Sequence, residues 1–143
     1  MNGLCEGLVG SALFAAICWI VWCAYGLSRT WQYRGSWRTY KIDGGQLTEI
    51  PNAIGTISCK HWWSPYDLEL KGSDQGREHC GTVMVNAAAP NRASVVLHYK
   101  DQIEFTAQEY FKPDKETMYV STAKPDYDYH VLKRAAGYRD TRL

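Results

Sequence analysis

The sequence predicts a single-pass transmembrane α-helix followed by a small, mainly antiparallel β (α+β) soluble domain that ends in a short C-terminal helix. Residues 8–27 contain no charged residue and no proline, whereas the rest of the chain holds all sixteen Lys and Arg residues. There, apolar residues alternate over short stretches between turn-forming residues, which is typical of strands. We therefore expect a transmembrane helix over 1–28, an aromatic and basic juxtamembrane segment over 29–52 and a β-rich domain over 53–143.

The apolar stretch has the length of a membrane span. Its twenty residues would rise about 30 Å as a helix, the thickness of the hydrocarbon core of a bilayer. A cleaved secretory signal is the alternative, with Ala24-Tyr25-Gly26 as a cleavage site. The residues before the stretch contain no Lys or Arg, so the basic segment that usually opens a signal is missing. We interpret the segment as a retained anchor.

The flanks of the span predict its orientation. Basic residues follow the span and none precedes it, so the positive-inside rule places the N-terminus outside and the C-terminal domain on the cytoplasmic or matrix side. Tryptophan, tyrosine and arginine side chains are enriched where a chain leaves the bilayer. The residues that we assign to this membrane interface are Trp19, Trp22, Tyr25, Arg29, Trp31, Arg34, Trp37 and Arg38.

The predicted span also has a face of small residues. Gly3, Gly7, Ser11 and Ala15 recur at every fourth position and would lie along one side of a helix. Small residues at this spacing let two helix backbones approach closely inside lipid. We therefore expect this face to pack against another transmembrane helix.

The remaining elements are predicted from turn residues and alternation. We expect strands over 54–60, 66–71, 79–86 and 117–122, with turns or loops over 72–76, 87–92 and 112–115. Residues 94–106 should form a hairpin around Lys100-Asp101, with Ile103 and Phe105 on the same apolar face as Val95. The last element should be a short helix that Asp128 caps and Gly137 ends.

Two cysteines and two histidines are the candidate metal ligands. Cys59 and His61 precede His79 and Cys80, which together are the ligand types of a structural zinc site. Adjacent residues of a strand point to opposite faces, so His79 and Cys80 are poorly placed to bind one ion. A Rieske iron–sulfur site would need a histidine three residues after Cys80, where Val83 stands. We therefore expect no zinc or iron–sulfur cofactor, and bound lipid is compatible with the predicted span.

No catalytic residue can be assigned, because the sequence lacks a nucleophile elbow, a phosphate-binding loop and a dinucleotide fingerprint. The near-neutral charge argues against nucleic acid as a partner. We expect a non-catalytic accessory subunit of a multi-subunit membrane complex, which contacts other subunits through the helix and the β-rich domain. A respiratory-chain or ATP synthase assembly of the mitochondrial inner membrane is the favoured host. The alternatives are a membrane-anchored metal or redox protein and a membrane-tethered adaptor.

Overall fold

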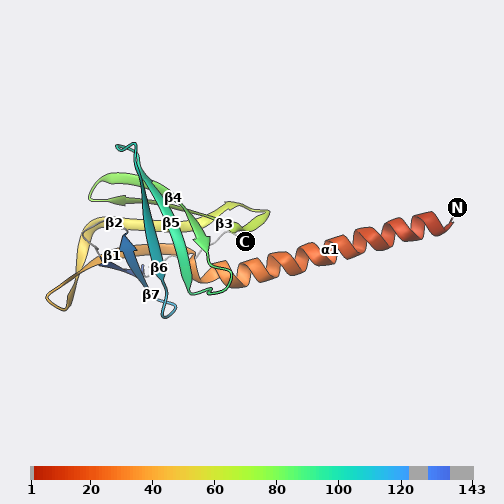
Figure 1. The fold of residues 1–143 in the computed structure, drawn as a ribbon, viewed down its shortest axis with the longest axis horizontal. Helices are drawn as coiled ribbons and strands as arrows, with labels where there is room; N and C mark the ends of the chain where they lie inside the picture. Colours follow the sequence, from red (N-terminus) through yellow and green to blue (C-terminus); the bar gives the residue numbers. More distant parts are fainter. Residues whose placement is uncertain (1, 123–128, 136–143) are drawn as a thin grey trace.

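The computed structural model describes residues 2–122 and 129–135, and in this part of the chain one long helix leads into an eight-stranded barrel (Figure 1). The helical segments are α1 (Asn2–Thr30) and the short 3-10 helix η1 (Trp31–Tyr33). The strands are β1 (Gly35–Asp43), β2 (Gln46–His61), β3 (Ser64–Asp74), β4 (Arg77–Val85), β5 (Arg92–Tyr99), β6 (Phe105–Phe111), β7 (Thr117–Thr122) and β8 (Tyr129–Arg134).

The fold class predicted from the sequence is wrong, because the strands form a closed barrel and not a small α+β domain. Each strand pairs antiparallel with the next one in the chain, and β1 closes the barrel by pairing with β8. The closing register runs from Trp37 opposite Arg134 to Lys41 opposite His130. Closure leaves neither β1 nor β8 as an open edge, which removes a site for unwanted strand pairing.

The predicted C-terminal helix is also wrong, because Tyr129–Arg134 forms strand β8. This strand pairs with β1 on one side and with β7 on the other, and it buries Val131 and Leu132. Two ladders of backbone hydrogen bonds outweigh a weak local preference for helix, and aromatic and β-branched residues fit a strand. The predicted cap Asp128 and the predicted stop Gly137 lie outside the described residues.

The segment assigned from the sequence to the juxtamembrane region lies largely in the barrel. It contains all of β1 and the first part of β2. Trp37, which we assigned to the membrane interface, is only 1% exposed and belongs to the barrel core. Its indole nitrogen donates a hydrogen bond to the Tyr33 carbonyl oxygen at 2.8 Å. Trp37 therefore faces protein and not lipid headgroups.

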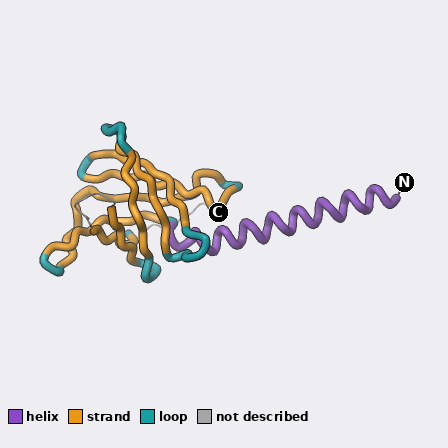
Figure 2. The backbone as a smooth tube through the Cα atoms, viewed as in Figure 1, coloured by secondary structure: helices purple, strands orange, loops and turns teal. Residues whose placement is uncertain are grey.

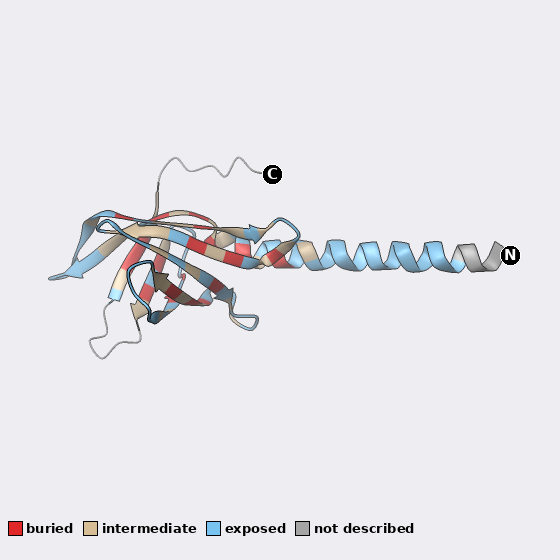
Figure 3. Ribbon diagram, turned by 90° about the horizontal axis from the view of Figure 1, so that it is seen from above, coloured by how far each residue is buried: buried red, intermediate tan, exposed pale blue. Residues whose placement is uncertain are grey.

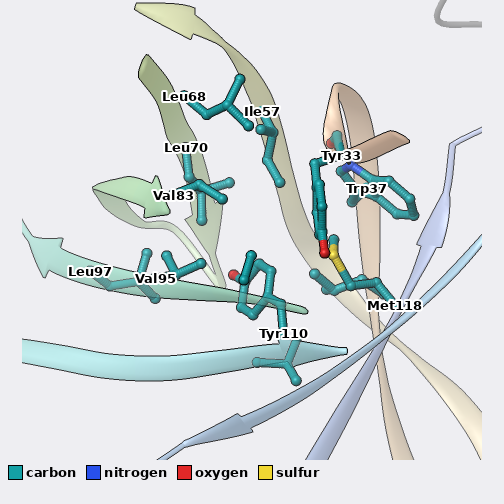
Figure 4. Packing of buried hydrophobic residues seen from close by; sticks show 13 residues of the cluster. Tyr33, Trp37, Ile57, Leu68, Leu70, Val83, Val95, Leu97, Tyr110 and Met118 are labelled. Atoms are coloured by element: carbon teal, nitrogen blue, oxygen red, sulfur yellow. Dashed lines mark hydrogen bonds between the residues drawn. The ribbon is translucent and has the colours of Figure 1, made fainter. Parts of the chain in front are cut away.

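The core fills the half of the barrel nearest to α1, where η1 connects the helix to β1. In β5, buried Ala93, Val95 and Leu97 alternate with the less buried Ser94 and Val96, as expected of a strand with one face inside a barrel. Figure 4 shows inward side chains from several strands facing one another, with Tyr33, Trp37 and Met118 on one side of the cluster. The buried cluster comprises Tyr33, Trp37, Ile57, Leu68, Leu70, Val83, Ala93, Val95, Leu97, Tyr110, Met118, Val120 and Leu132.

The predicted hairpin over 94–106 corresponds to β5, β6 and the loop between them. Val95 points into the core, but Ile103 is 95% exposed and Phe105 is 70% exposed. The prediction that Ile103 and Phe105 share the buried face is therefore wrong. Ile103 lies in the loop and not in a strand, so the alternation of strand residues does not extend to it.

Helix α1 projects away from the barrel as a separate rod (Figure 2). It is exposed along nearly its whole length (Figure 3). Its most apolar eighteen residues have a mean hydropathy of 2.0, and none of these is buried in protein. A helix of this length and composition can cross a membrane, and a signal sequence near the N-terminus has the same properties.

The C-terminal end of α1 is packed against the barrel. A Cβ atom on Gly26 would lie 2.6 Å from Cγ of Pro65 and 2.7 Å from the Tyr66 ring, so only glycine allows this approach. The Tyr66 hydroxyl donates to the Trp22 carbonyl oxygen at 3.3 Å. Thr30, which is 1% exposed, donates to the Gly26 carbonyl oxygen at 2.9 Å. The last turns of the helix are thereby fixed on β3.

Candidate functional site: a cavity inside the barrel

Two cationic side chains contact a buried tryptophan at the end of the barrel nearest to α1. The Arg134 guanidinium carbon lies 4.6 Å from the centre of the Trp37 ring, and the Lys112 Nζ lies 4.7 Å from the same ring. Arg134 also donates to the backbone carbonyl oxygens of Arg34 at 2.7 Å and Gln32 at 3.1 Å. Cation–π contacts and charge-assisted hydrogen bonds therefore join η1, β1 and β8.

Lys112 is a buried cation at this end of the barrel. The residue is 3% exposed, and its Nζ donates to the Asp114 carbonyl oxygen at 2.6 Å. Burial, and secondly the positive charge of Arg134, lower the pKa of Lys112 to about 8. The Lys112 amine therefore loses its proton at a lower pH than the amine of an exposed lysine does.

The opposite half of the barrel is hollow, with a cavity of about 360 Å³. It extends from Trp37 and Ile57 to the end of the barrel furthest from α1, where the β3–β4 and β5–β6 connections lie. The residues that line it are Trp37, Thr39, Ile50, Ile54, Gly55, Ile57, Leu70, Ser73, Asp74, Arg77, His79, Leu97, Tyr99, Gln102, Thr106, Gln108, Tyr110, Val120, Thr122, His130 and Leu132. An eight-stranded barrel is wide enough for a packed interior or for one small ligand.

Glycines within the strands allow the wall to pack closely around the cavity. A Cβ atom on Gly72 would lie 2.5 Å from the Ile54 carbonyl oxygen and 2.8 Å from Nε2 of His79. A Cβ atom on Gly55, which lines the cavity, would lie 3.0 Å from Cδ1 of Leu70. Glycine inside a strand often marks a tight bend or a close approach of this kind.

Hydroxyl and amide groups lie among the apolar side chains of the cavity wall. The Tyr110 hydroxyl donates to Oε1 of Gln108 at 3.1 Å. Burial raises the pKa of Tyr110 above its usual range, so its hydroxyl stays protonated at neutral pH. Thr39, Thr106 and Thr122 add further hydroxyl groups to the lining. The deeper wall can therefore donate and accept hydrogen bonds without presenting a charge.

At the mouth, an ion pair connects the start of β4 with the β5–β6 loop. Nε and NH2 of Arg77 donate to the two carboxylate oxygens of Asp101, at 2.9 Å and 3.1 Å. The guanidinium carbon also lies 4.7 Å from the centre of the Tyr99 ring. The hydrogen bond between them lowers the pKa of Asp101 and raises that of Arg77. The Arg77 guanidinium at the mouth is thus already paired.

His79 lies on the cavity wall next to this ion pair. Its ring centre is 5.4 Å from that of Tyr99. Burial is the main cause that lowers the pKa of His79 below the ordinary 6.5, while the charge of Asp74 acts in the opposite direction. Nδ1 is buried and has no hydrogen-bond partner among the described residues. The lowered pKa favours the neutral imidazole, in which one ring nitrogen is a donor and the other an acceptor.

The four candidate metal ligands that the sequence suggests are not brought together in the structure. Cys59 pairs with Leu68 of β3, whereas Cys80 pairs with Lys71. These β3 partners are three residues apart, or about 10 Å along the strand. His61 lies near the opposite end of β3 from His79, where its ring stacks on Trp63 at 4.6 Å. Within residues 2–122 and 129–135, no three Cys, His, Asp or Glu side chains are grouped to hold a metal ion.

The four residues of the predicted helix-packing face, Gly3, Gly7, Ser11 and Ala15, all lie in α1. Ser11 donates to the Gly7 carbonyl oxygen at 2.9 Å, and Gly7, Ser11 and Ala15 are exposed. Packing of this face against another helix stays a prediction.

Among the predicted interface residues, Trp19, Trp22, Tyr25 and Trp31 are between 45% and 60% exposed. The three arginines of this group differ in their surroundings. Arg29 donates a hydrogen bond to the Ala87 carbonyl oxygen of the β4–β5 loop, and the half-buried Arg34 donates to Thr30. Arg38 is exposed on β1 and pairs with Glu49 at 3.0 Å.

The cavity was missed in the sequence because its lining residues come from all eight strands. The available indication was local, namely single glycines at positions 55, 72 and 81 inside stretches that otherwise alternate as strands. These positions predict bends or close approaches in a sheet, but not the pairing of its first and last strands.

Comparisons with known proteins show a likeness of fold. No family model matches the chain, and no curated protein matches its sequence. A solved structure of a redesigned β-barrel superposes with a TM-score of 0.54 at 16% identity. The match covers 75% of this chain and 95% of the redesigned barrel. At this identity, the chain is similar to the redesigned protein in its barrel architecture alone.

Proposed function

We propose that the chain is a membrane-anchored binding protein whose barrel holds one small, uncharged molecule. The observation that carries the proposal is the division of the barrel interior. Side chains fill the half near α1, whereas the other half contains a cavity of about 360 Å³. This volume lies in the range of known small-molecule sites.

The chemistry of the wall supports an uncharged ligand. Leu97, Val120 and Leu132 offer apolar surface, while Gln108 and Tyr110 offer a few hydrogen-bonding groups. Ligand sites commonly combine a mostly apolar wall with a few polar groups that set orientation. Because Arg77 is already paired with Asp101 at the mouth, an anionic ligand would have to compete with an existing ion pair. We infer a ligand that is largely apolar and carries one or two polar groups.

The anchoring part of the proposal rests on α1. Its apolar surface is uncovered in the described structure, and the contacts of Gly26 and Trp22 with Pro65 and Tyr66 favour a helix that is retained over one that is cleaved. The positive-inside rule continues to favour a barrel on the cytoplasmic or matrix side. Placement in the mitochondrial inner membrane stays a prediction.

A role as an accessory subunit of a membrane complex is a second proposal, and the exposed apolar surface of α1 favours it. A helix without a protein neighbour can pack against the helices of another subunit. The two proposals are compatible, since a subunit can also hold a ligand. Co-purification of the chain with a complex in fixed stoichiometry would support the second proposal. We do not carry the metal or redox alternative forward, because the register separates its candidate ligands.

Blocking the cavity tests the binding proposal. Thr106 lines the cavity, whereas the next residue, Ala107, is exposed on the outer face of β6. Thr106→Trp places a large ring inside, and Ala107→Trp is the matched control outside. The full chain in detergent is titrated with 1-naphthol or 1-decanol, and its melting temperature is followed by near-ultraviolet circular dichroism.

Ligands that bind only the folded state raise the melting temperature. We expect at least one of the two alcohols to do so for the unmodified chain and for Ala107→Trp, but not for Thr106→Trp. An equal response of all three proteins would place the effect in the micelle. That result would contradict a binding cavity, and so would the absence of any response to either alcohol.

A further inference from the structure

We propose that the tip of the β2–β3 hairpin, formed by Trp62 and Trp63, inserts into the headgroup region of the bilayer that α1 crosses. This inference rests on the membrane anchoring proposed above and is independent of the ligand. Trp62 is 86% exposed and Trp63 is 51% exposed. Tryptophan side chains of this exposure, adjacent at the end of a hairpin, leave a large apolar surface in water.

The hairpin lies beside the C-terminal part of α1. Figures 1 and 3 both show the loop between β2 and β3 extending from the barrel along the helix. Contacts fix this placement, because Pro65 and Tyr66 pack on Gly26. The rings of Tyr66 and Trp22 lie 4.9 Å apart. The tip is therefore held on the same side of the barrel as the helix.

These contacts also give the level of the tip along the helix. Gly26 and Trp22 lie in the last turns of the apolar stretch of residues 8–27, about 6 Å apart along the helix axis. If that stretch spans the hydrocarbon core, its last turns lie at the boundary between acyl chains and headgroups. The Trp62–Trp63 tip then lies at the level of that boundary.

The chemistry of the tip fits this level. Tryptophan combines a large apolar ring with one N–H donor, and it is enriched where the bilayer meets water. Trp62 and Trp63 pack edge to face with their ring centres 5.8 Å apart, and His61 stacks on Trp63. The rings support one another, so little ordering remains when they enter the headgroup layer.

The bilayer is the occupant that the position favours. The tip continues the exposed apolar surface of α1, so both would contact the same lipid leaflet. Ile103 is exposed even more, at 95%, but it lies in the loop between β5 and β6 at the opposite end of the barrel. With two contact points, helix and hairpin, the barrel would have a defined orientation on the membrane, with the cavity mouth facing water.

Tryptophan fluorescence in lipid vesicles tests the inference. The full chain and the double variant Trp62→Phe/Trp63→Phe are reconstituted in phosphatidylcholine vesicles with plain or brominated acyl chains. Bromine quenches tryptophan at short range, and phenylalanine preserves the apolar character of the tip. The difference in emission between the two proteins reports on the hairpin. The residual emission of the double variant includes Trp19 and Trp22 and so reports separately on α1.

We expect brominated lipid to quench most of the difference emission, and iodide in the water to leave it largely unchanged. Adding Ile103→Trp to the double variant provides the control, since this ring should respond to iodide and not to bromine. Difference emission that iodide quenches and bromine does not would overturn the inference while the residual emission still reports an inserted helix. Loss of bromine quenching from the residual emission as well would instead contradict the anchoring proposal. Difference emission that neither reagent reaches would indicate a protein contact and would also overturn the inference.

Discussion

The guanidinium carbon of Arg134, at the end of the last strand, lies 4.6 Å from the centre of the Trp37 ring on the first strand. The two residues are also opposite each other in the register that closes the barrel. Gly35 makes room for this contact, since it has a φ of +121° and a Cβ atom there would lie 2.7 Å from NH1 of Arg134. One arginine therefore connects the two ends of the barrel sequence.

Arg134→Ala should lower the free energy of unfolding by about 2–4 kcal/mol, because it leaves the half-buried Gln32 and Arg34 carbonyl groups without their donor and uncovers Trp37. The neighbouring Lys133, which is exposed, provides the control. Lys133→Ala should change stability by no more than about 0.5 kcal/mol. Urea unfolding in detergent, followed by near-ultraviolet circular dichroism, measures both. Equal effects of the two substitutions would show that the Arg134 contacts stabilise the barrel no more than those of an exposed lysine.

A second prediction concerns the pH dependence at Lys112. In the unfolded chain its amine keeps the proton up to the ordinary pKa of 10.5, whereas in the barrel the pKa is lowered to about 8. Between these values the unfolded chain binds more protons, so stability rises with pH. The free energy of unfolding of the unmodified chain, relative to Lys112→Met, should therefore increase from pH 8 towards pH 10.5 and be flat below pH 8. A flat or falling difference across that window would contradict a desolvated amine.

The third prediction addresses the joint between helix and barrel. Gly26→Leu forces a side chain into Pro65 and Tyr66, so it should destabilise the joint by about 1–3 kcal/mol. Gly10→Leu is the control, since nothing lies within 4 Å of a Cβ atom there. The melting temperature should fall for Gly26→Leu alone. If Gly10→Leu lowers it as much, the effect comes from the detergent-exposed helix and not from the joint.

The sequence was sufficient for features that depend on neighbouring residues. The strand predicted over 117–122 is β7, and the predicted hairpin around Lys100-Asp101 joins β5 to β6. The position of each feature follows from strand residues and a turn within about a dozen residues, although the buried face predicted for Ile103 and Phe105 was wrong. Local patterns of this kind are set by the two-residue period of a strand.

Features that depend on distant residues were not predicted. Closure of the barrel pairs Trp37 with Arg134, nearly a hundred positions apart, and nothing local in either segment indicates the other. The same long-range pairing converts the predicted C-terminal helix into β8. It also moves Trp37 from the predicted membrane interface into the core. The cavity follows from closure, so it was not predictable before the pairing of β1 and β8 was known.

The last prediction concerns the small-residue face of α1. Gly7→Leu/Ser11→Leu adds bulk to the face along which Gly3, Gly7, Ser11 and Ala15 recur, so it should weaken packing against a neighbouring helix in lipid. Ala12 and Ala16 lie on a different side of the helix, since each residue turns by about 100°, and Ala12→Leu/Ala16→Leu is the matched control. Both double variants should insert into the membrane. Proteins that co-purify with the unmodified chain from its own membrane should be lost with the first variant and retained with the second. Retention with both would show that this face does not carry the contact, and loss with both would show that helix bulk in general, and not this face, disturbs the assembly.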